Sequence, residues 1–121
     1  MRVKRYRGTV TRGAGRATRL GFPTINVPLS DASVSGVYAA EAEIGGKRYR
    51  AAAFADPLRG ILEAHLLDFE GDLYGTEAVI ELSTKLRDGM RFENDAELSR
   101  AIAEDARRIR EYFDRRSSSG V

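Results

Sequence analysis

Apolar and polar residues alternate along most of the first 90 residues, which is the pattern of half-buried strands. We expect strands at residues 3–11, 36–44, 47–54, 61–69 and 77–86, with a further extended segment around residue 25. Gly45 and Gly46 separate two of these strands and are typical of a tight hairpin. The pattern therefore predicts an all-β domain built from about six short strands.

The spacing of apolar residues changes after residue 94 to one every three or four positions, as in an amphipathic helix. Asn94, followed three residues later by Glu97, indicates where the helix begins. Its predicted buried stripe consists of Leu98, Ile102, Ala106, Ile109 and Phe113. We expect one domain over residues 1–116, a closed or nearly closed barrel with the helix packed outside, and a flexible tail over residues 117–121.

Composition excludes several classes of site. The 121 residues contain no cysteine, which excludes disulfides and thiolate metal sites. His65 is the single histidine, so neither a histidine-pair metal site nor a His-x-Gly-His nucleotidyltransferase motif can form. No apolar run approaches the roughly 18 residues of a membrane span, and the first residues do not resemble a signal peptide. We expect a cytoplasmic monomer.

Charge is uneven although the net charge is only +2. Residues 1–30 hold seven basic and no acidic residues, which leaves 13 basic and 18 acidic residues beyond them. Such a basic end suits nucleotide phosphate or nucleic acid, or it is a solvated face without a partner. Base stacking needs several aromatic residues, and only Tyr6 lies between the first and last of these basic residues, Arg2 and Arg19, so we expect no nucleic acid partner.

A glycine-rich loop follows the first predicted strand. Its spacing matches neither a P-loop nor a dinucleotide-binding fingerprint. Gly13, Gly15 and Gly21 would let backbone N–H groups approach an anion, and Arg19 is one of the arginines that supply positive charge. The loop therefore predicts a phosphate-binding segment.

Thr24 and Asn26 come directly after this loop. Because they are two residues apart, both side chains point to the same face of an extended strand. A hydroxyl and an amide oxygen suit a Mg²⁺ ion that keeps its other positions for water and phosphate oxygens. The alternative is that the two side chains only cap a turn.

Glu63 is the most informative acid, because its predicted strand places it on one face with Ile61, His65, Leu67 and Phe69. An unpaired carboxylate among apolar residues is costly, so it either finds a partner or has its pKa raised toward the range of a general base. The alternative is a salt-bridged residue at the rim of the barrel. We assign no chemistry to His65.

Residues 20–26 read Leu-Gly-Phe-Pro-Thr-Ile-Asn. This segment resembles the Leu-Gly-Phe-Pro-Thr-Ala-Asn signature of riboflavin kinases, found as standalone enzymes and as the C-terminal module of bacterial bifunctional FAD synthetases. Residues 36–39, 62–69, 72–75 and 86–88 with Phe92 resemble further motifs of this family, in the same order.

The resemblance implies a six-stranded antiparallel Greek-key barrel that transfers the ATP γ-phosphate to the 5′-hydroxyl of riboflavin, giving FMN and ADP. It implies that Glu63 activates this hydroxyl, that Thr24 and Asn26 hold Mg²⁺, and that Arg87 and Phe92 contact the flavin. The implied ATP-binding residues are Gly13, Gly15, Arg19, Gly21, Leu66, Asp68 and Tyr74. We expect the standalone form, without an adenylyltransferase domain. Two alternatives stay open, a non-catalytic flavin- or nucleotide-binding barrel and a basic barrel that binds nucleic acid.

Overall fold

The computed structural model of the chain describes residues 4–9, 24–68, 75–89 and 92–119. Its elements are β1 (Lys4–Thr9), β2 (Thr24–Pro28), β3 (Gly36–Ile44), β4 (Lys47–Asp56), β5 (Ile61–Leu66), β6 (Glu77–Arg87) and α2 (Asp95–Ser119). The six strands form one antiparallel sheet in the order β1-β6-β3-β4-β5-β2. The order β6-β3-β4-β5 is that of a Greek key, so this expectation is confirmed.

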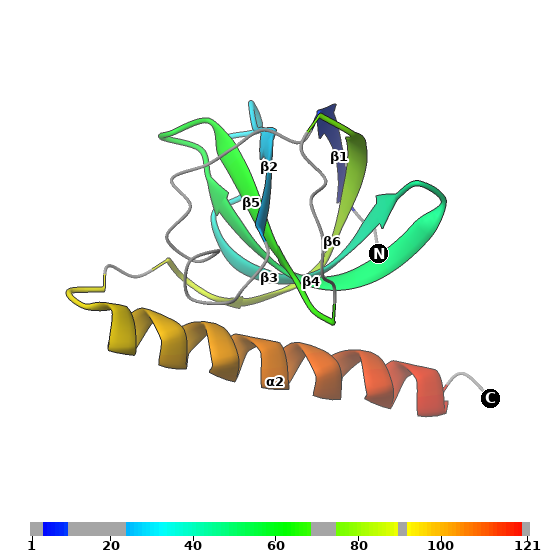
Figure 1. Ribbon diagram of the computed structural model, residues 1–121, viewed down its shortest axis with the longest axis vertical. Coiled ribbons are helices and arrows are strands. Elements are labelled where there is room, and N and C mark those ends of the chain that lie inside the picture. Colours follow the sequence, from blue (N-terminus) through cyan, green and yellow to red (C-terminus); the bar gives the residue numbers. More distant parts are fainter. Residues whose placement is uncertain (1–3, 10–23, 69–74, 90–91, 120–121) are drawn as a thin grey trace.

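The sheet curls until its two edge strands meet. A Cβ atom added to Gly8 of β1 would lie 2.9 Å from the Cδ atom of Pro28 and 3.0 Å from the Cβ atom of Val27, both on β2. The glycine lets the two edges approach, and the result is a nearly closed barrel. Figure 1 shows this barrel with α2 lying across one side of it.

The inside of the barrel is filled by alternate residues of every inner strand. On β5, Leu62, Ala64 and Leu66 point into this core, and Ile61, Glu63 and His65 therefore lie on the outer face. The core side chains come from β2 to β6 and the segments joining them, and they are almost entirely apolar. The alternation predicted for residues 61–69 is confirmed as far as Leu66.

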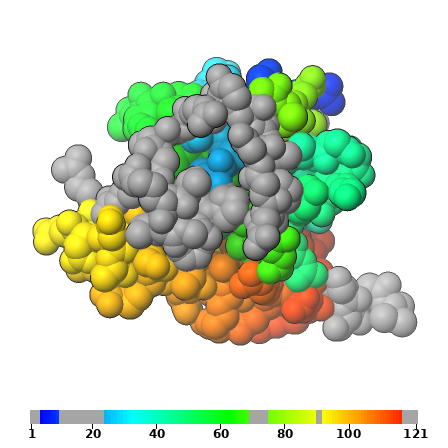
Figure 2. All heavy atoms as spheres, viewed as in Figure 1, coloured from blue at the N-terminus to red at the C-terminus, as the bar shows by residue number. Residues whose placement is uncertain are grey.

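Helix α2 packs on the outer face of β3 and β4. Ala39 and Ala52 present small side chains there, and Ala106, Ile109 and Phe113 of the helix cover them. Because alanine is small, the helix can lie close to the strand backbones. In the space-filling view α2 forms one whole side of the molecule, from yellow to red (Figure 2).

The helix begins as its sequence indicates. The side-chain oxygen of Asn94 accepts a hydrogen bond from the backbone N–H of Glu97 at 2.9 Å. Four of the five predicted stripe residues are buried, whereas Leu98 is half-buried. The helix continues to Ser119, beyond the point at residue 117 where we expected the tail to begin.

One predicted strand is shorter than expected. Strand β5 ends at Leu66 rather than Phe69, and Asp68 has a φ of 57°, in the left-handed region. This backbone turns Asp68 out of the predicted alternation, so it does not share the core-facing side of Leu66, and its side chain is exposed. No helix of the described segments is long and apolar enough to cross a membrane.

Gly36 and Gly46 both have left-handed backbones, and comparing them tests how closely Gly36 packs against the end of β6. Gly36 has a φ of 96°, and a Cβ atom there would lie 2.6 Å from the carbonyl oxygen of Arg87. Gly46 has a φ of 80° with nothing within 4 Å. We expect Gly46→Ala to cost about 1–2 kcal/mol from backbone strain alone, and Gly36→Ala to cost clearly more because it adds a clash. Urea unfolding of both variants measures this, and equal losses would contradict the close approach.

Candidate active site

The pairing of β2 with β5 brings the predicted metal ligands and the predicted base together. In the antiparallel register Asn26 lies opposite Glu63, and Thr24 lies opposite His65. Directly opposed residues share a face, with Cβ atoms about 4.5–5.5 Å apart. Thr24, Asn26, Glu63 and His65 therefore form one cluster on the outer face of the barrel. The expectation that Thr24 and Asn26 share one face of a strand is confirmed.

Glu63 is half-buried in this cluster. The Nη1 atom of Arg59, in the turn before β5, lies 3.5 Å from its Oε1 atom. Burial raises the pKa of Glu63, the Arg59 guanidinium partly offsets this by favouring the carboxylate, and Asp56 adds a smaller upward effect. The carboxylate thus has a raised pKa and a weak ion pair, so both outcomes considered from the sequence occur together.

His65 is 8% exposed, and burial lowers its pKa to about 4. Its ring is therefore neutral at neutral pH. The Nε2 atom lies 3.9 Å from the Oε2 atom of Glu63, and within the described residues the buried Nδ1 atom has no hydrogen-bond partner. Because the ring is neutral, it adds no positive charge beside Glu63 and leaves the raised pKa of that carboxylate in place.

The donors at Thr24 and Asn26 fit a small hard cation. Asn26 is 5% exposed, so the orientation of its side chain is restricted by packing. Across the described segments no group of three or more His, Cys, Asp or Glu side chains could hold a metal ion. A hydroxyl and an amide oxygen can hold Mg²⁺ only when water and phosphate oxygens complete its shell, which is how this ion usually binds beside a nucleotide.

Arg87 and Phe92, the two predicted flavin contacts, lie together. The Arg87 guanidinium lies over the Phe92 ring, with 5.9 Å between the Cζ atom and the ring centroid. Two irregularities in the pairing of β3 with β6 precede this end of β6, and such bulges bend a strand and redirect its side chains. Phe54, opposite Glu63 on β4, lies against Gly89, so the loop after β6 borders the cluster around Glu63.

The predicted ATP-binding residues are only partly described. Leu66 is buried in the barrel core, so only its backbone is available to a ligand. Asp68 is exposed and accepts a hydrogen bond from Arg110 of α2 at 3.1 Å. Gly13, Gly15, Arg19, Gly21 and Tyr74 lie outside the described residues.

The comparison with known families decides the relationship. Residues 1–113 match the family model of riboflavin kinase, or flavokinase. The chain belongs to the riboflavin kinase family. The bifunctional riboflavin kinase/FMN adenylyltransferase of Escherichia coli K12 is 38% identical over 115 residues, which cover 88% of this chain and 37% of that protein. The chain thus spans a little over a third of the length of this relative.

Solved structures agree with the fold. A structure described as a macrolide-efflux protein from Streptococcus pneumoniae has a TM-score of 0.75 and 29% identity, covering 88% of this chain and 38% of that one. The riboflavin kinase from Trypanosoma brucei has a TM-score of 0.66 and 23% identity, covering 94% of this chain and 82% of that one. Both share with this member of the riboflavin kinase family a barrel of the kind described above.

Sequence reasoning missed two charged residues near the cluster. Arg59 reaches Glu63 from a turn, and nothing in the strand pattern indicates this contact. Asp105 is 4% exposed on α2 and pairs with Arg87. The sequence did indicate a special position for Asp105. It is three residues after Ile102 and four before Ile109, so the helical spacing places an acid within the predicted apolar stripe.

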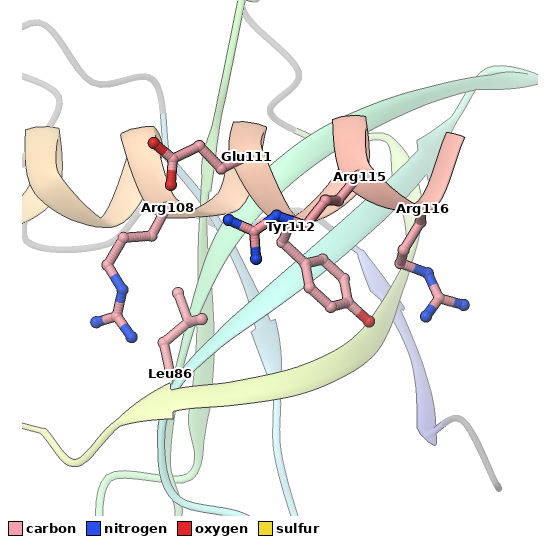
Figure 3. Close-up of a pocket in the computed structure, with 6 residues that line it drawn as sticks. All are labelled: Leu86, Arg108, Glu111, Tyr112, Arg115 and Arg116. Carbon is pink, nitrogen blue, oxygen red and sulfur yellow. The ribbon is translucent and has the colours of Figure 1, made fainter. Parts of the chain in front are cut away.

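A separate hollow of about 500 Å³ lies between the end of β6 and the C-terminal half of α2. Figure 3 shows the residues that line it, which are Leu86, Arg108, Glu111, Tyr112, Arg115 and Arg116. None of them is a predicted site residue. The hollow is open and basic, and it is not the cluster around Glu63.

The raised pKa of Glu63 predicts an effect on stability. A carboxyl group whose pKa is higher in the folded than in the unfolded state stabilises the fold when protonated, and this contribution is lost as pH rises through the folded pKa. We therefore expect Glu63→Gln to have a Tm at pH 8 equal to or above that of the parent, with any difference shrinking toward pH 4. Glu43→Gln, at an exposed position of β3, is the matched control and should change little. A clear fall in Tm for Glu63→Gln alone would contradict the burial penalty.

Proposed function

We propose that this chain is a riboflavin kinase, which transfers the γ-phosphate of ATP to the 5′-hydroxyl of riboflavin and releases FMN and ADP. The observation that carries the proposal is the register of β2 with β5, which sets Asn26 opposite Glu63 in a chain of the riboflavin kinase family. Phosphoryl transfer requires mainly that the nucleophile and the phosphate be positioned and that phosphate charge be neutralised. A base and a cation site on adjacent strands meet both requirements.

Glu63 is the proposed general base. Its carboxylate takes the proton of the 5′-hydroxyl as the oxygen bonds to the γ-phosphorus and the bond from this phosphorus to the β,γ-bridging oxygen breaks, so that ADP leaves. Burial raises the pKa of Glu63 above that of an ordinary glutamate, which brings its basicity closer to the working pH of an enzyme. Arg59, whose Nη1 atom lies 3.5 Å from the Oε1 atom of Glu63, lowers this pKa and so offsets the effect of burial only in part.

Thr24 and Asn26 are the proposed ligands of Mg²⁺. When bound, the ion would neutralise charge on the ATP phosphates. Their place directly after the glycine-rich loop would bring that loop and the phosphates to the same end of β2. The role of Gly13, Gly15, Arg19 and Gly21 in covering the phosphates stays a prediction.

The remaining substrate contacts are proposed in two groups. The end of β5, through the Leu66 backbone, the exposed Asp68 side chain and Tyr74, would border the adenine nucleotide. Arg87 and Phe92 would close on the flavin, since the Arg87 guanidinium already lies over the Phe92 ring there. A cytoplasmic location, a monomeric state and the absence of a nucleic acid partner also stay predictions.

The direct test is FMN formation from riboflavin, ATP and Mg²⁺, followed by chromatography. We expect Glu63→Gln to lower turnover by about 10²-fold or more, because the base is removed while the shape is kept. We expect Thr24→Ala to raise the Mg²⁺ concentration that gives half-maximal rate. Glu43→Gln is the control for loss of a carboxylate elsewhere on the barrel. Near-normal turnover of Glu63→Gln would remove Glu63 from the mechanism, and retained flavin binding without FMN would indicate a non-catalytic barrel.

The pH dependence of kcat/KM tests the role of Glu63, because two variants should shift it in opposite directions. The base must be unprotonated, so kcat/KM should rise with pH along an acid limb set by the pKa of Glu63. Arg59→Gln removes a cation that lowers this pKa and should shift the limb to higher pH. Asp56→Asn removes an anion that raises it and should shift the limb to lower pH. Shifts in the same direction, or no shift in either variant, would contradict the assignment of the limb to Glu63.

A further inference from the structure

The buried polar and charged side chains of the described residues are Asn26, His65 and Asp105. Asn26 and His65 belong to the cluster on the outer face of the barrel. Asp105 lies on α2, the helix that covers this face, and it has no role in the mechanism proposed above. Asp105 is near enough to His65 for its carboxylate to affect the histidine ring electrostatically. A charged group at this place therefore needs an explanation.

The contact of Asp105 with Arg87 has a defined geometry. Arg87 donates two hydrogen bonds, from Nε to Oδ1 at 3.0 Å and from Nη2 to Oδ2 at 2.8 Å. A third donor, Nη1, reaches the backbone oxygen of Asp88 at 3.1 Å. Paired parallel hydrogen bonds fix the plane of a guanidinium as well as its position. The Cζ atom of the same guanidinium lies over the ring of Phe92, 5.9 Å from the ring centroid.

Other ion pairs join α2 to the barrel without these properties. Asp114 accepts from Arg50 at 2.8 Å, and Asp68 accepts from Arg110 at 3.1 Å, but both carboxylates are largely exposed. Buried ion pairs are poor stabilisers, since removing both charges from water often costs more than their attraction returns. The geometry that the Arg87–Asp105 pair fixes therefore explains it better than a gain in stability does.

We propose that Asp105 is a positioning residue for the flavin: its carboxylate fixes the Arg87 guanidinium, and thereby the Phe92 ring, at the place where the planar isoalloxazine ring of riboflavin binds. The proposal rests on the proposed function, because it takes riboflavin as the ligand. It gives α2 a part in the site, where the helix would otherwise only cover the outer face of the barrel.

The test compares Asp105→Asn with Asp114→Asn, the same substitution at an exposed ion pair on the same helix. We measure riboflavin Kd from quenching of flavin fluorescence, KM for riboflavin and for ATP, kcat and Tm. For Asp105→Asn we expect riboflavin Kd and KM to rise about tenfold or more, with kcat and the KM for ATP changed less than about threefold. Asp114→Asn should leave all five quantities near those of the parent.

A double-mutant cycle with Arg87→Lys separates positioning from a purely structural role. Lysine keeps the charge and loses the paired hydrogen bonds, so Arg87→Lys should also raise the riboflavin Kd. If Asp105 acts through Arg87, adding Asp105→Asn to Arg87→Lys should raise the riboflavin Kd little further. Asp105→Glu, made in the parent protein, keeps the carboxylate and should bind riboflavin more tightly than Asp105→Asn does. Fully additive effects on Kd would overturn the proposal.

The other outcomes are also decisive. An unchanged riboflavin Kd in a folded Asp105→Asn protein would make Asp105 a structural residue only. A lower kcat with unchanged riboflavin KM would mean that Asp105 acts on the Glu63 side, which also overturns the proposal. If Asp105→Asn does not fold, Asp105→Glu decides, because it keeps the charge and moves the carboxylate: an unchanged riboflavin Kd refutes the proposal, and a raised Kd with kcat and the KM for ATP little changed supports it. A parent protein that neither binds riboflavin nor forms FMN would instead refute the proposed function.

Discussion

The antiparallel pairing of β2 with β5 is the constraint on which the site depends. It places Asn26 opposite Glu63, and a slip of one residue would send one of them to the opposite face. The register is held from inside, because Val27 of β2 and Leu62 of β5 are fully buried in the barrel core. It is held at the end of the strands by the hydrogen bond from the Leu29 N–H to the Gly60 oxygen at 2.9 Å. The apolar core thus sets the geometry of a polar site on the other face of the same two strands.

The outer face of the barrel has an apolar part and a polar part. Ala39 and Ala52 give an apolar seat for the helix, and this seat supplies the favourable burial. Beside it, Asp105 of the helix, His65 and Asn26 are buried as polar groups, and burial raises the pKa of Glu63 and lowers that of His65. The desolvation of Glu63 and His65 opposes stability, and the apolar part of the helix interface helps to offset it. Such a balance is typical of functional sites, where local rules of packing are broken and compensated elsewhere.

Much of this arrangement could be predicted from the sequence. Strand β3, the hairpin to β4 and the Asn94 cap follow directly from alternation, Gly45-Gly46 and the capping pattern. The shared face of Thr24 and Asn26, and that of Glu63 and His65, follow from a period of two, but this period does not say which face points outward. Other features depend on tertiary contacts: the left-handed Asp68, the irregular β6 that directs Arg87 toward α2, and the reach of Arg59 to Glu63. Periodicity assumes a regular strand, so it fails where a bulge or a turn redirects a side chain.

The central claim is that one cation site and one base lie opposite each other on β2 and β5. Paramagnetic broadening in NMR spectra, with Mn²⁺ replacing Mg²⁺ in the presence of ADP, tests it most directly. The account predicts that the side-chain amide of Asn26 and the backbone amides of Thr24 and Glu63 broaden first as Mn²⁺ is added. The Gly45-Gly46 hairpin, which lies away from the β2–β5 pair, should broaden last. Sharp Asn26 and Glu63 signals when Mn²⁺ and ADP are saturating would contradict the account.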